Sequence, residues 1–334
     1  MELRIPIDEM IRQYIRVLES RGLTPPRAAL CAKLFAETDR DGVYSHGLRR
    51  FGSLIENIDT GYVNPKAEPA LVTAAGALEQ WDSGRSPGNL AAWASMGRAI
   101  ELARLHGLGC VALRRTTHWM RAGTYGWQAA EAGCIGLCWT NTMPCVPPWG
   151  ARTNAVGNNP LVLAVPRKEG HVVLDMAMSQ LSIGRMSIYR DKGEPLPVEG
   201  GYDKAGRLSR NAADVLATRR FLPAGLWKGA GLSLLLDMIA AMLSGGLASF
   251  DMQGTPREAG VSQVFLAIDP TRLSSPEHLE HVAQGAVALV LGAEPIKPGE
   301  TIQYPGMHVL ETRQENLRLG IPVEEKLWQK MLAM

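Results

Sequence analysis

The 334-residue sequence lacks the features that mark several large classes of protein. Its 35 Lys and Arg side chains are nearly balanced by 33 Asp and Glu, which leaves a net charge of +2 and little attraction for a phosphate backbone. The longest apolar stretch, 232–243, is interrupted by Asp237 and is shorter than the roughly 20 residues that span a bilayer. We therefore expect neither a nucleic-acid partner nor a membrane segment.

Two further absences concern the cellular compartment and metal binding. The sequence does not begin with the charged and apolar regions of a secretory signal peptide. No Cys-x-x-Cys pair occurs among the five cysteines, which are Cys31, Cys110, Cys134, Cys138 and Cys145. Most of them lie in apolar runs, so we expect reduced, buried thiols in a cytoplasmic protein without a metal. A zinc site at the last three is the weaker alternative.

The usual nucleotide-binding fingerprints are also missing. No Gly-x-Gly-x-x-Gly follows a predicted strand, and no phosphate-binding loop ends in Gly-Lys-Ser or Gly-Lys-Thr. Composition is that of an ordinary globular chain, with length for about two domains. Neither motifs nor composition by themselves predict a nicotinamide cofactor.

Hydrophobic periodicity predicts helices at both ends of the chain. Apolar residues recur at three- and four-residue steps through 7–18, and Thr24 followed by Pro25 is typical of a helix start. A third helix is predicted to begin with Ser45 as its N-cap. The last segment, 309–334, returns to helical spacing, so we expect it to pack against this N-terminal bundle.

Short apolar runs between these ends predict a sheet. The predicted strands are 70–73, 77–81, 109–113, 135–139, 161–165, 172–174 and 264–268, and the predicted helices are 89–106, 124–132, 228–243 and 276–291. Alternation of strands with helices usually indicates a doubly wound parallel sheet, which the residues alone therefore favour.

The first candidate for chemistry lies at the start of the predicted third helix. With Ser45 as N-cap, His46 would lie in the first turn and Arg50 one turn further on the same face. Imidazole exchanges a proton near neutral pH, and guanidinium binds a carboxylate with two hydrogen bonds. The pair predicts an acid–base group beside a substrate clamp. The structural alternative is a packed histidine and a surface cation.

The second candidate follows the predicted strand that ends at residue 113. His118 and Arg121 stand there beside Trp119 and Met120, and loops at strand ends commonly hold ligands. This grouping predicts a partly desolvated pocket for a charged substrate. A turn with Trp119 in the core and solvated arginines is an equally good interpretation.

Three weaker signals follow along the chain. The proline-rich segment 141–150, continued by 157–160, predicts a rigid loop. Asp175 and Ser179 leave a predicted strand, and Trp227 with Lys228 opens a glycine-rich helix that suits a phosphate group. Each of these signals alone is more often structural than functional.

Taken together, these segments resemble the type-2 malate/lactate dehydrogenase family of NAD(P)-dependent oxidoreductases. The resemblance spans nearly the whole chain. Its most specific pieces are Gly-Val-Tyr-Ser-His-Gly (42–47), Glu-Gln-Trp-Asp (79–82), His-Trp-Met-Arg (118–121), Gly-Trp-Gln-Ala-Ala-Glu (126–131), Pro-Pro-Trp-Gly (147–150) and Trp-Lys-Gly (227–229).

The resemblance implies a non-Rossmann α/β (α+β) fold. A mixed, largely antiparallel sheet would form the cofactor and substrate domain over 76–304, and residues 1–75 would pack with 305–334 as a helical domain. It further implies a homodimer with the active site near the subunit interface, NADH or alternatively NADPH as the cofactor, and no metal.

The family's functional residues fall on matching positions of this chain. His46 would be the proton donor, and His118 has the acid–base role in some relatives. Apart from the resemblance, we expect Arg50 to clamp the substrate carboxylate with support from His118 and Arg121, and Ser45 to be a further substrate-binding residue. The implied cofactor contacts are Val173, Leu174, Asp175, Met176, Ala177, Met178, Ser179, Trp227, Lys228, Gly306, Met307 and His308.

The implied activity is reduction of a small 2-keto or 2,3-diketo acid by hydride transfer. Alternatives are a malate-, lactate- or ureidoglycolate-type dehydrogenase, an imino acid reductase, and a non-catalytic binding protein of the same fold. Close relatives tend to have Gly-His-Glu where this chain has Gly306-Met307-His308. An acidic contact to a cofactor ribose is therefore missing, which leaves the choice between NADH and NADPH open.

Overall fold

The computed structural model describes residues 2–255 and 260–334. The helices are α1 (Ile7–Ser20), α2 (Pro25–Arg40), α3 (Leu48–Asp59), α4 (Gly88–His106), α5 (Gly123–Glu131), α6 (Ile183–Lys192), α7 (Ala212–Thr218), α8 (Trp227–Ser244), α9 (Pro276–Leu291), α10 (Met307–Leu319) and α11 (Glu325–Leu332). The strands are β1 (Glu2–Ile5), β2 (Ala70–Ala75), β3 (Leu78–Asp82), β4 (Leu108–Thr116), β5 (Ile135–Thr140), β6 (Leu161–Val165), β7 (Val172–Met176), β8 (Gly201–Tyr202), β9 (Leu208–Ser209), β10 (Val261–Ile268) and β11 (Ile321–Glu324).

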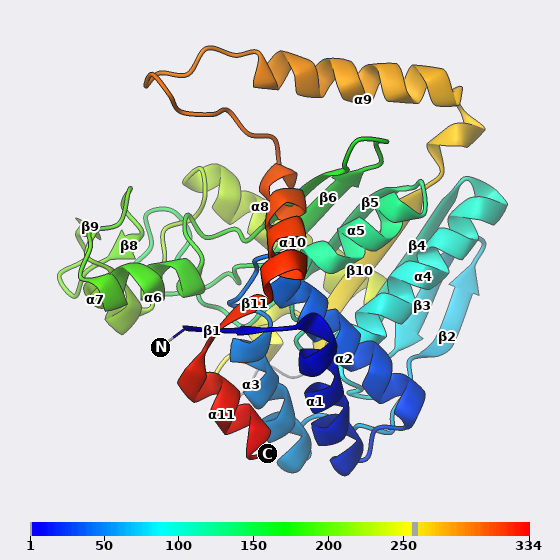
Figure 1. Ribbon diagram of the computed structural model, residues 1–334, viewed down its shortest axis with the longest axis horizontal. Coiled ribbons are helices and arrows are strands. Elements are labelled where there is room, and N and C mark those ends of the chain that lie inside the picture. Colours follow the sequence, from blue (N-terminus) through cyan, green and yellow to red (C-terminus); the bar gives the residue numbers. More distant parts are fainter. Residues whose placement is uncertain (1, 256–259) are drawn as a thin grey trace.

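A central sheet has the strand order β2-β3-β4-β10-β5-β6-β7 (Figure 1). Within the described ranges, β3 and β4 are its only parallel pair. The parallel sheet that strand–helix alternation favoured is therefore wrong, and the mixed, largely antiparallel sheet implied by the family resemblance is confirmed. Late in the chain, β10 inserts between β4 and β5 and runs antiparallel to both, an arrangement that local alternation cannot reveal.

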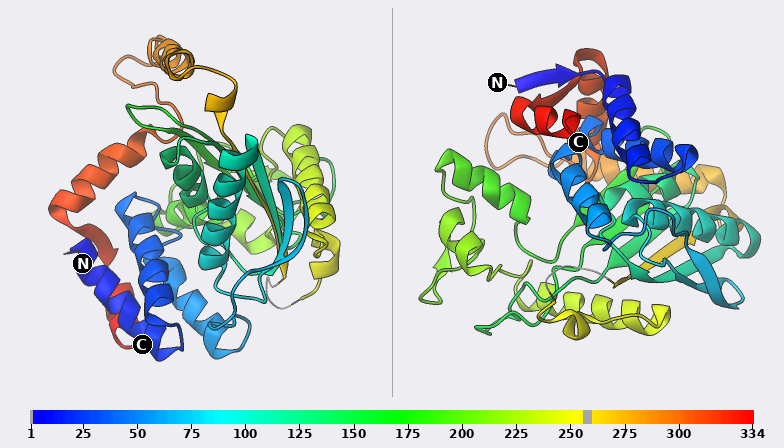
Figure 2. Two further views of the ribbon diagram at one scale, coloured as in Figure 1. Left: turned by 90° about the vertical axis from the view of Figure 1, so that its right-hand side faces the viewer. Right: turned by 90° about the horizontal axis from the view of Figure 1, so that it is seen from below.

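Helices cover both faces of this sheet (Figure 2). On one face, α4 and α5 pack on a core that includes Met96, Leu113 and Phe265. Small residues allow this close packing: a Cβ on Gly109 would lie 2.1 Å from the Ala99 carbonyl oxygen. On the other face, α8 packs against β4, β10 and β5.

Both ends of the chain form one helical layer beside the sheet (Figure 1). Tyr14 of α1 stacks on Phe51 of α3 with ring centroids 4.3 Å apart, and Phe35 of α2 meets Phe51 edge-on at 5.2 Å. Trp328 of α11 is buried in the same core. Both ends of the chain therefore share one core, as expected, and their assignment to a separate domain stays a prediction.

The helical spacing over 309–334 corresponds to two helices, α10 and α11. The last helices are separated at Gly320, whose φ of +84° ends α10, and by β11. This strand pairs antiparallel with β1 at the opposite end of the sequence. Four-residue strands are too short to show a period, so neither was predicted.

A small lobe at 179–224 contains α6, α7 and the β8–β9 pair, and none of these elements was predicted. Its core joins Met186, Leu196 and Phe221 to Val146 and Val156 of the proline-rich loop. The lobe lies close to the turn before α3 that carries Ser45, because a Cβ on Gly184 would lie 3.0 Å from the Ser45 Cβ.

Within the described residues, the helix α8 is long and apolar enough to cross a membrane by length and composition, and 39% of it is buried. Its buried Leu236 and Ala240 pack on the sheet. Leu235, Met238 and Met242 are exposed, at 54%, 41% and 72%. A partly buried helix of this kind is also found in the cores of soluble proteins, so this one helix is weak evidence for a membrane span.

Candidate active site

His46 lies in the turn before α3 and not in its first helical turn. The structure begins α3 at Leu48, so the prediction that Ser45 is the N-cap is wrong. Asp39 of α2 supplies the cap instead: its buried carboxyl group accepts a hydrogen bond of 2.7 Å from the Leu48 N–H. A Cβ on Gly47 would come within 2.1 Å of this carboxyl, so the turn requires glycine there.

The structure brings His46 and His118 together from two separate turns. Their rings are nearly parallel, with centroids 6.0 Å apart, and both side chains are partly buried. Burial lowers the pKa of His46 to about 4, with the charges of Arg50 and Arg121 acting in the same direction. Burial, Arg50 and His46 also hold the pKa of His118 well below its usual value. The predicted cluster of two histidines beside Arg50 is assembled.

The turn that carries His118 is anchored on several sides. The Tyr125 hydroxyl donates a hydrogen bond to the Trp119 carbonyl, and the Thr117 hydroxyl donates to the Ser86 carbonyl at 3.1 Å. The start of α4 lies so close that a Cβ on Gly88 would be 2.3 Å from the His118 carbonyl oxygen. The position of His118 is therefore fixed by packing as well as by the hydrogen bonds of its turn.

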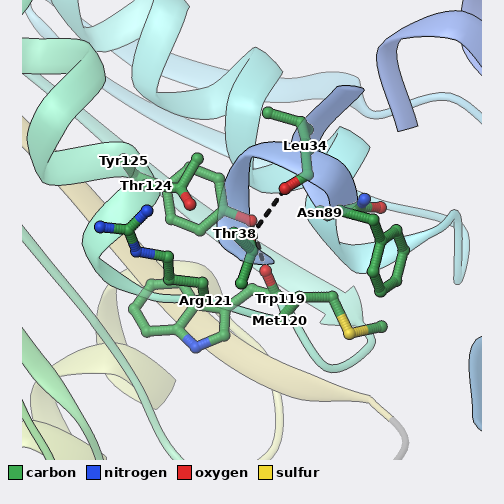
Figure 3. Close-up of a pocket in the computed structure, with 9 residues that line it drawn as sticks. Leu34, Thr38, Asn89, Trp119, Met120, Arg121, Thr124 and Tyr125 are labelled. Atoms are coloured by element: carbon green, nitrogen blue, oxygen red, sulfur yellow. Dashed lines mark hydrogen bonds between the residues drawn. The ribbon is translucent and has the colours of Figure 1, made fainter. Parts of the chain in front are cut away.

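A narrow cavity between α2 and this turn leaves no room for a water molecule. Figure 3 shows Trp119, Met120 and Arg121 extending from the turn, with Thr38 and Leu34 facing them from α2. Trp119 is buried in the core, as the structural interpretation of this segment predicted. It fixes the turn without removing His118 from the partly exposed surface.

Arg121 is buried in an ion-pair cluster. Its Nη1 lies 2.6 Å from Asp41 Oδ2, and the two side chains are 5% and 2% exposed. Arg313 of α10 donates to both Asp41 oxygens at 2.8 Å, and Arg40 contacts Oδ1. Although burial favours the neutral carboxyl, the hydrogen bonds and charges of these arginines lower the pKa of Asp41. The substrate contact of Arg121 stays a prediction.

Two of the segments predicted to contact a cofactor meet at β7. Val173 donates a hydrogen bond of 3.0 Å to the Pro305 carbonyl, and a Cβ on Gly306 would lie 3.2 Å from the Val173 nitrogen. Ser179 forms a β-bridge with Pro223 shortly before α8 begins. The other predicted positions lie on the same segments: Leu174, Asp175 and Met176 in β7, Ala177 and Met178 after it, Trp227 and Lys228 at the start of α8, and Met307 and His308 in the first turn of α10.

The residues along these segments fit a dinucleotide. The buried Ser179 hydroxyl has no hydrogen-bond partner in the described part of the chain, whereas buried hydroxyls normally have one. At the start of α8, Lys228 and the backbone N–H groups suit a phosphate, and the 66% exposed Trp227 offers a flat face. Asp175 is already partly engaged, because its Oδ2 accepts a hydrogen bond of 2.7 Å from the Gly123 N–H at the start of α5.

Residues 2–255 and 260–334 contain no group of three or more His, Cys, Asp or Glu side chains that could hold a metal ion. No disulfide joins cysteines within the described residues, and Cys31, Cys110, Cys134 and Cys138 are buried. Burial raises the pKa of the Cys110 thiol to about 11. The geometry therefore offers two adjacent histidines and a guanidinium for an anionic substrate.

Sequence reasoning missed the two carboxylates that hold these turns in place. Asp39 follows the buried Phe35 by four residues and therefore lies on the buried stripe of α2, which is the one signal that could have identified it. Asp41 lies just past the end of the same helix, and its partners Arg121 and Arg313 are distant in the sequence. No spacing rule could have paired them.

Comparisons with known proteins agree with this architecture. The family model described as malate/L-lactate dehydrogenase matches residues 5–332. The 2,3-diketo-L-gulonate reductase of Citrobacter koseri is 43% identical over 333 residues, covering 99% of this chain and 100% of that protein.

Two solved structures have the same fold. The malate dehydrogenase of Pyrococcus horikoshii has a TM-score of 0.89 at 28% identity, over 98% of this chain and 93% of that one. The delta1-piperideine-2-carboxylate reductase of Pseudomonas syringae pvar. tomato has a TM-score of 0.87 at 26% identity, over 99% of each chain. The chain therefore belongs to the malate/L-lactate dehydrogenase family of NAD(P)-dependent dehydrogenases and reductases that act on hydroxy and keto acids.

Proposed function

We propose that this protein reduces 2,3-diketo-L-gulonate with NADH, and that His46 is the proton donor. The observation that carries the proposal is the parallel arrangement of His46 and His118 at 6.0 Å, with Arg50 near both rings. The full-length relative at 43% identity bears the name of that reductase. A small diketo acid has the two groups that this cluster suits, a carbonyl oxygen that takes a proton and a carboxylate.

The chain's own residues would divide the work in the following way. Arg50 binds the substrate carboxylate, and Arg121 adds positive charge from its place beside Asp41. When bound, the reduced nicotinamide supplies a hydride to the carbonyl carbon. His46 gives its proton to the carbonyl oxygen, and holding these groups in register supplies much of the rate enhancement.

The substrate's charge would assist proton uptake by His46. Arg50 and Arg121 contribute to the low pKa of the free imidazole. A bound carboxylate offsets the Arg50 charge and so raises that pKa in the complex. Reduction therefore weakens as the pH rises through the pKa of His46 in the complex, and oxidation of the alcohol shows the opposite trend.

The cofactor would lie along β7 and the starts of α8 and α10. Ser179 would donate to the cofactor, Lys228 would bind a phosphate, and Gly306 would allow close approach of the backbone. We propose NADH as the donor, with NADPH as the alternative. We also propose that residues 1–75 with 305–334 and residues 76–304 are the two domains, with the site between them.

We further propose a cytoplasmic homodimer. The exposed apolar face of α8, with Leu235, Met238 and Met242, supports a surface that a second copy covers. The buried thiols of Cys31, Cys110, Cys134 and Cys138 support a reducing compartment. Met242→Glu is expected to give monomers in light scattering at a concentration where the parent protein is dimeric. An unchanged mass would reject α8 as the interface.

A substrate panel tests the activity. Purified protein is assayed with 2-keto, 2,3-diketo and cyclic imino acids, each with NADH and NADPH in parallel. We expect the highest kcat/KM for 2,3-diketo-L-gulonate with NADH, and a loss of kcat of about 100-fold or more in His46→Gln. His281→Gln, on the exposed surface of α9, is the matched control and should keep full activity. Reduction of none of these acids, or full activity in His46→Gln, would reject the proposal.

A further inference from the structure

The two site histidines have chemically different partners at the same ring nitrogen. His46 Nδ1 lies 2.8 Å from the Ser45 hydroxyl oxygen. His118 Nδ1 accepts a hydrogen bond of 3.0 Å from the backbone N–H of Met120. A hydroxyl can both donate and accept a hydrogen bond, whereas a backbone N–H can only donate. This difference decides which ring can carry two protons.

His118 cannot be doubly protonated without breaking this contact. Since Nδ1 accepts the Met120 N–H, the proton of the neutral ring is on Nε2. An imidazolium would place a second N–H against the Met120 N–H, and the positive charges of Arg50 and a protonated His46 would add to the penalty. The partial burial of His118 also disfavours the charged ring.

The Met120 N–H cannot easily turn away to relieve that conflict. Met120 has a φ of +65°, an uncommon conformation for a residue other than glycine, which costs of order 1–3 kcal/mol unless its surroundings hold it. On one side, the Trp119 carbonyl is held by the Tyr125 hydroxyl. On the other, the His118 carbonyl lies against Gly88, where there is no space for even a methyl group. The donor is fixed in place.

His46, in contrast, can carry two protons without losing its hydrogen bond at Nδ1. The Ser45 oxygen can accept a hydrogen bond from Nδ1–H whether the ring is neutral or an imidazolium. With that nitrogen occupied, Nε2 is left to gain and lose the second proton. The charged groups that act on this ring are Arg50 of α3 and Arg121 of the turn before α5, and His118 lies next to it. None of them occupies its Nδ1 hydrogen bond.

We propose that His118 is a permanently neutral donor which binds the substrate through Nε2–H, so that the proton transfer assigned above is left to His46 alone. Ser45 and the Met120 N–H are the positioning groups that set this division. The proposal rests on the proposed reductase function, and it changes the predicted role of Ser45 from substrate binding to support of His46.

The step balances as follows. A hydride from the reduced nicotinamide forms the new C–H bond with both of its electrons, so the carbonyl carbon is reduced and the nicotinamide is oxidised. The Nε2–H bond of the His46 imidazolium breaks, and an O–H bond forms at the former carbonyl oxygen. Nδ1–H of His46 remains bonded to the Ser45 oxygen throughout, and no bond to a proton changes at His118.

Nitrogen NMR of the full-length protein labelled with ¹⁵N-histidine tests the protonation states directly. His46→Gln and His118→Gln assign the two signals. We expect His118 to remain protonated at Nε2 alone throughout a titration that passes below the His46 pKa of about 4, whereas His46 gains its second proton within that titration. Oxamate, a small carboxylate probe, should raise the pKa of His46 because its charge offsets Arg50. A second proton on His118 within that titration would overturn the proposal.

Kinetics test the role of Ser45. Ser45→Ala removes the acceptor, so kcat for reduction should fall about 10-fold and the pH profile should move to lower pH. Ser45→Thr keeps a hydroxyl and should stay close to the parent protein. A raised KM in Ser45→Ala with the parent's pH profile would instead indicate substrate binding, and would overturn this part of the proposal.

His118→Gln supplies a neutral N–H donor in place of imidazole. We expect it to lose far less activity than His46→Gln and to keep the parent's pH profile. A change in that profile equal to the change in His46→Gln would contradict the assignment. The NMR result can be obtained even if no diketo acid is reduced, so failure of the proposed activity and failure of this assignment are distinguishable.

Discussion

The Asp41 carboxylate is the point at which three separate segments of this protein meet, so its loss should lower the free energy of unfolding. Arg121 from the turn that carries His118, Arg313 from α10 and Arg40 at the end of α2 all contact it. Asp41→Asn keeps the size of the side chain but removes its charge. The arginines, of which Arg121 is only 5% exposed, would then lack their counter-charge.

The size of the effect follows from burial. Removal of one partner from a buried ion pair destabilises a protein by about 3–5 kcal/mol. With an unfolding entropy of about 2.1 cal/mol/K per residue, this loss lowers the Tm of a chain of 334 residues by roughly 4–7 °C. Asp59→Asn is the matched control: it breaks a pair with Arg21 at 3.3 Å in which Asp59 is 51% exposed. Such a pair contributes at most about 1 kcal/mol, so Tm should change by roughly 1 °C.

Circular dichroism at 222 nm during heating, at one scan rate and without ligand, measures both variants. The pH dependence provides a second check. The pKa of Asp41 is lowered in the folded protein, so its contribution is present above the unfolded value near 4 and is lost as the pH falls through the folded value. The Tm difference between parent and Asp41→Asn should therefore persist from pH 7 to pH 5 and shrink below about pH 4. Equal Tm values for Asp41→Asn and Asp59→Asn at pH 7 would refute this reasoning.

Two further predictions concern the anchors of the histidine turns. Burial raises the pKa of Asp39 to about 8. The parent protein should therefore lose stability relative to Asp39→Asn as the pH rises from about 4 to 8, and the difference should be constant above that range. Parallel Tm curves of the two proteins over this range would contradict the prediction. Gly88→Ala should displace the His118 turn and lower kcat/KM about 10-fold, because the new Cβ would lie 2.3 Å from a carbonyl oxygen. The control is Gly285→Ala on an open face of α9, which should leave activity unchanged. Equal activity in the Gly88 and Gly285 variants would show that the His118 turn tolerates the methyl group.

Local patterns predicted the long helices and the buried strands well, because these elements carry several periods of apolar residues. The segment 161–165 is an example: it is β6 in the structure with the same bounds. The direction of the strands was not predictable in this way, since it depends on where β10 enters the sheet. Short elements such as β1 and β11 are defined by each other across the whole length of the chain.

The sequence indicated which residues form the candidate site, but not the contacts that hold those residues in place. His46, Arg50 and His118 were selected by proton chemistry and position, and the structure gathers them. The cap of α3 was assigned to the wrong residue because the usual rule places an N-cap next in sequence, whereas Asp39 reaches Leu48 from α2. Contacts of this kind depend on the packing of two helices and leave no local signal.

The two histidine turns are supported by different means, and this difference bears on function. The His46 turn depends on a carboxyl group beneath Gly47, which can titrate, and on a hydroxyl beside the ring, which can donate or accept a hydrogen bond. The His118 turn depends on backbone groups, a buried indole and a glycine contact, none of which titrates. A group that must change its protonation state in each cycle needs partners that can adapt, whereas one that only donates a hydrogen bond gains from rigidity. The same asymmetry links Asp39 to the pH dependence of stability and Ser45 to the pH dependence of catalysis, so the two dependences should change in separate variants.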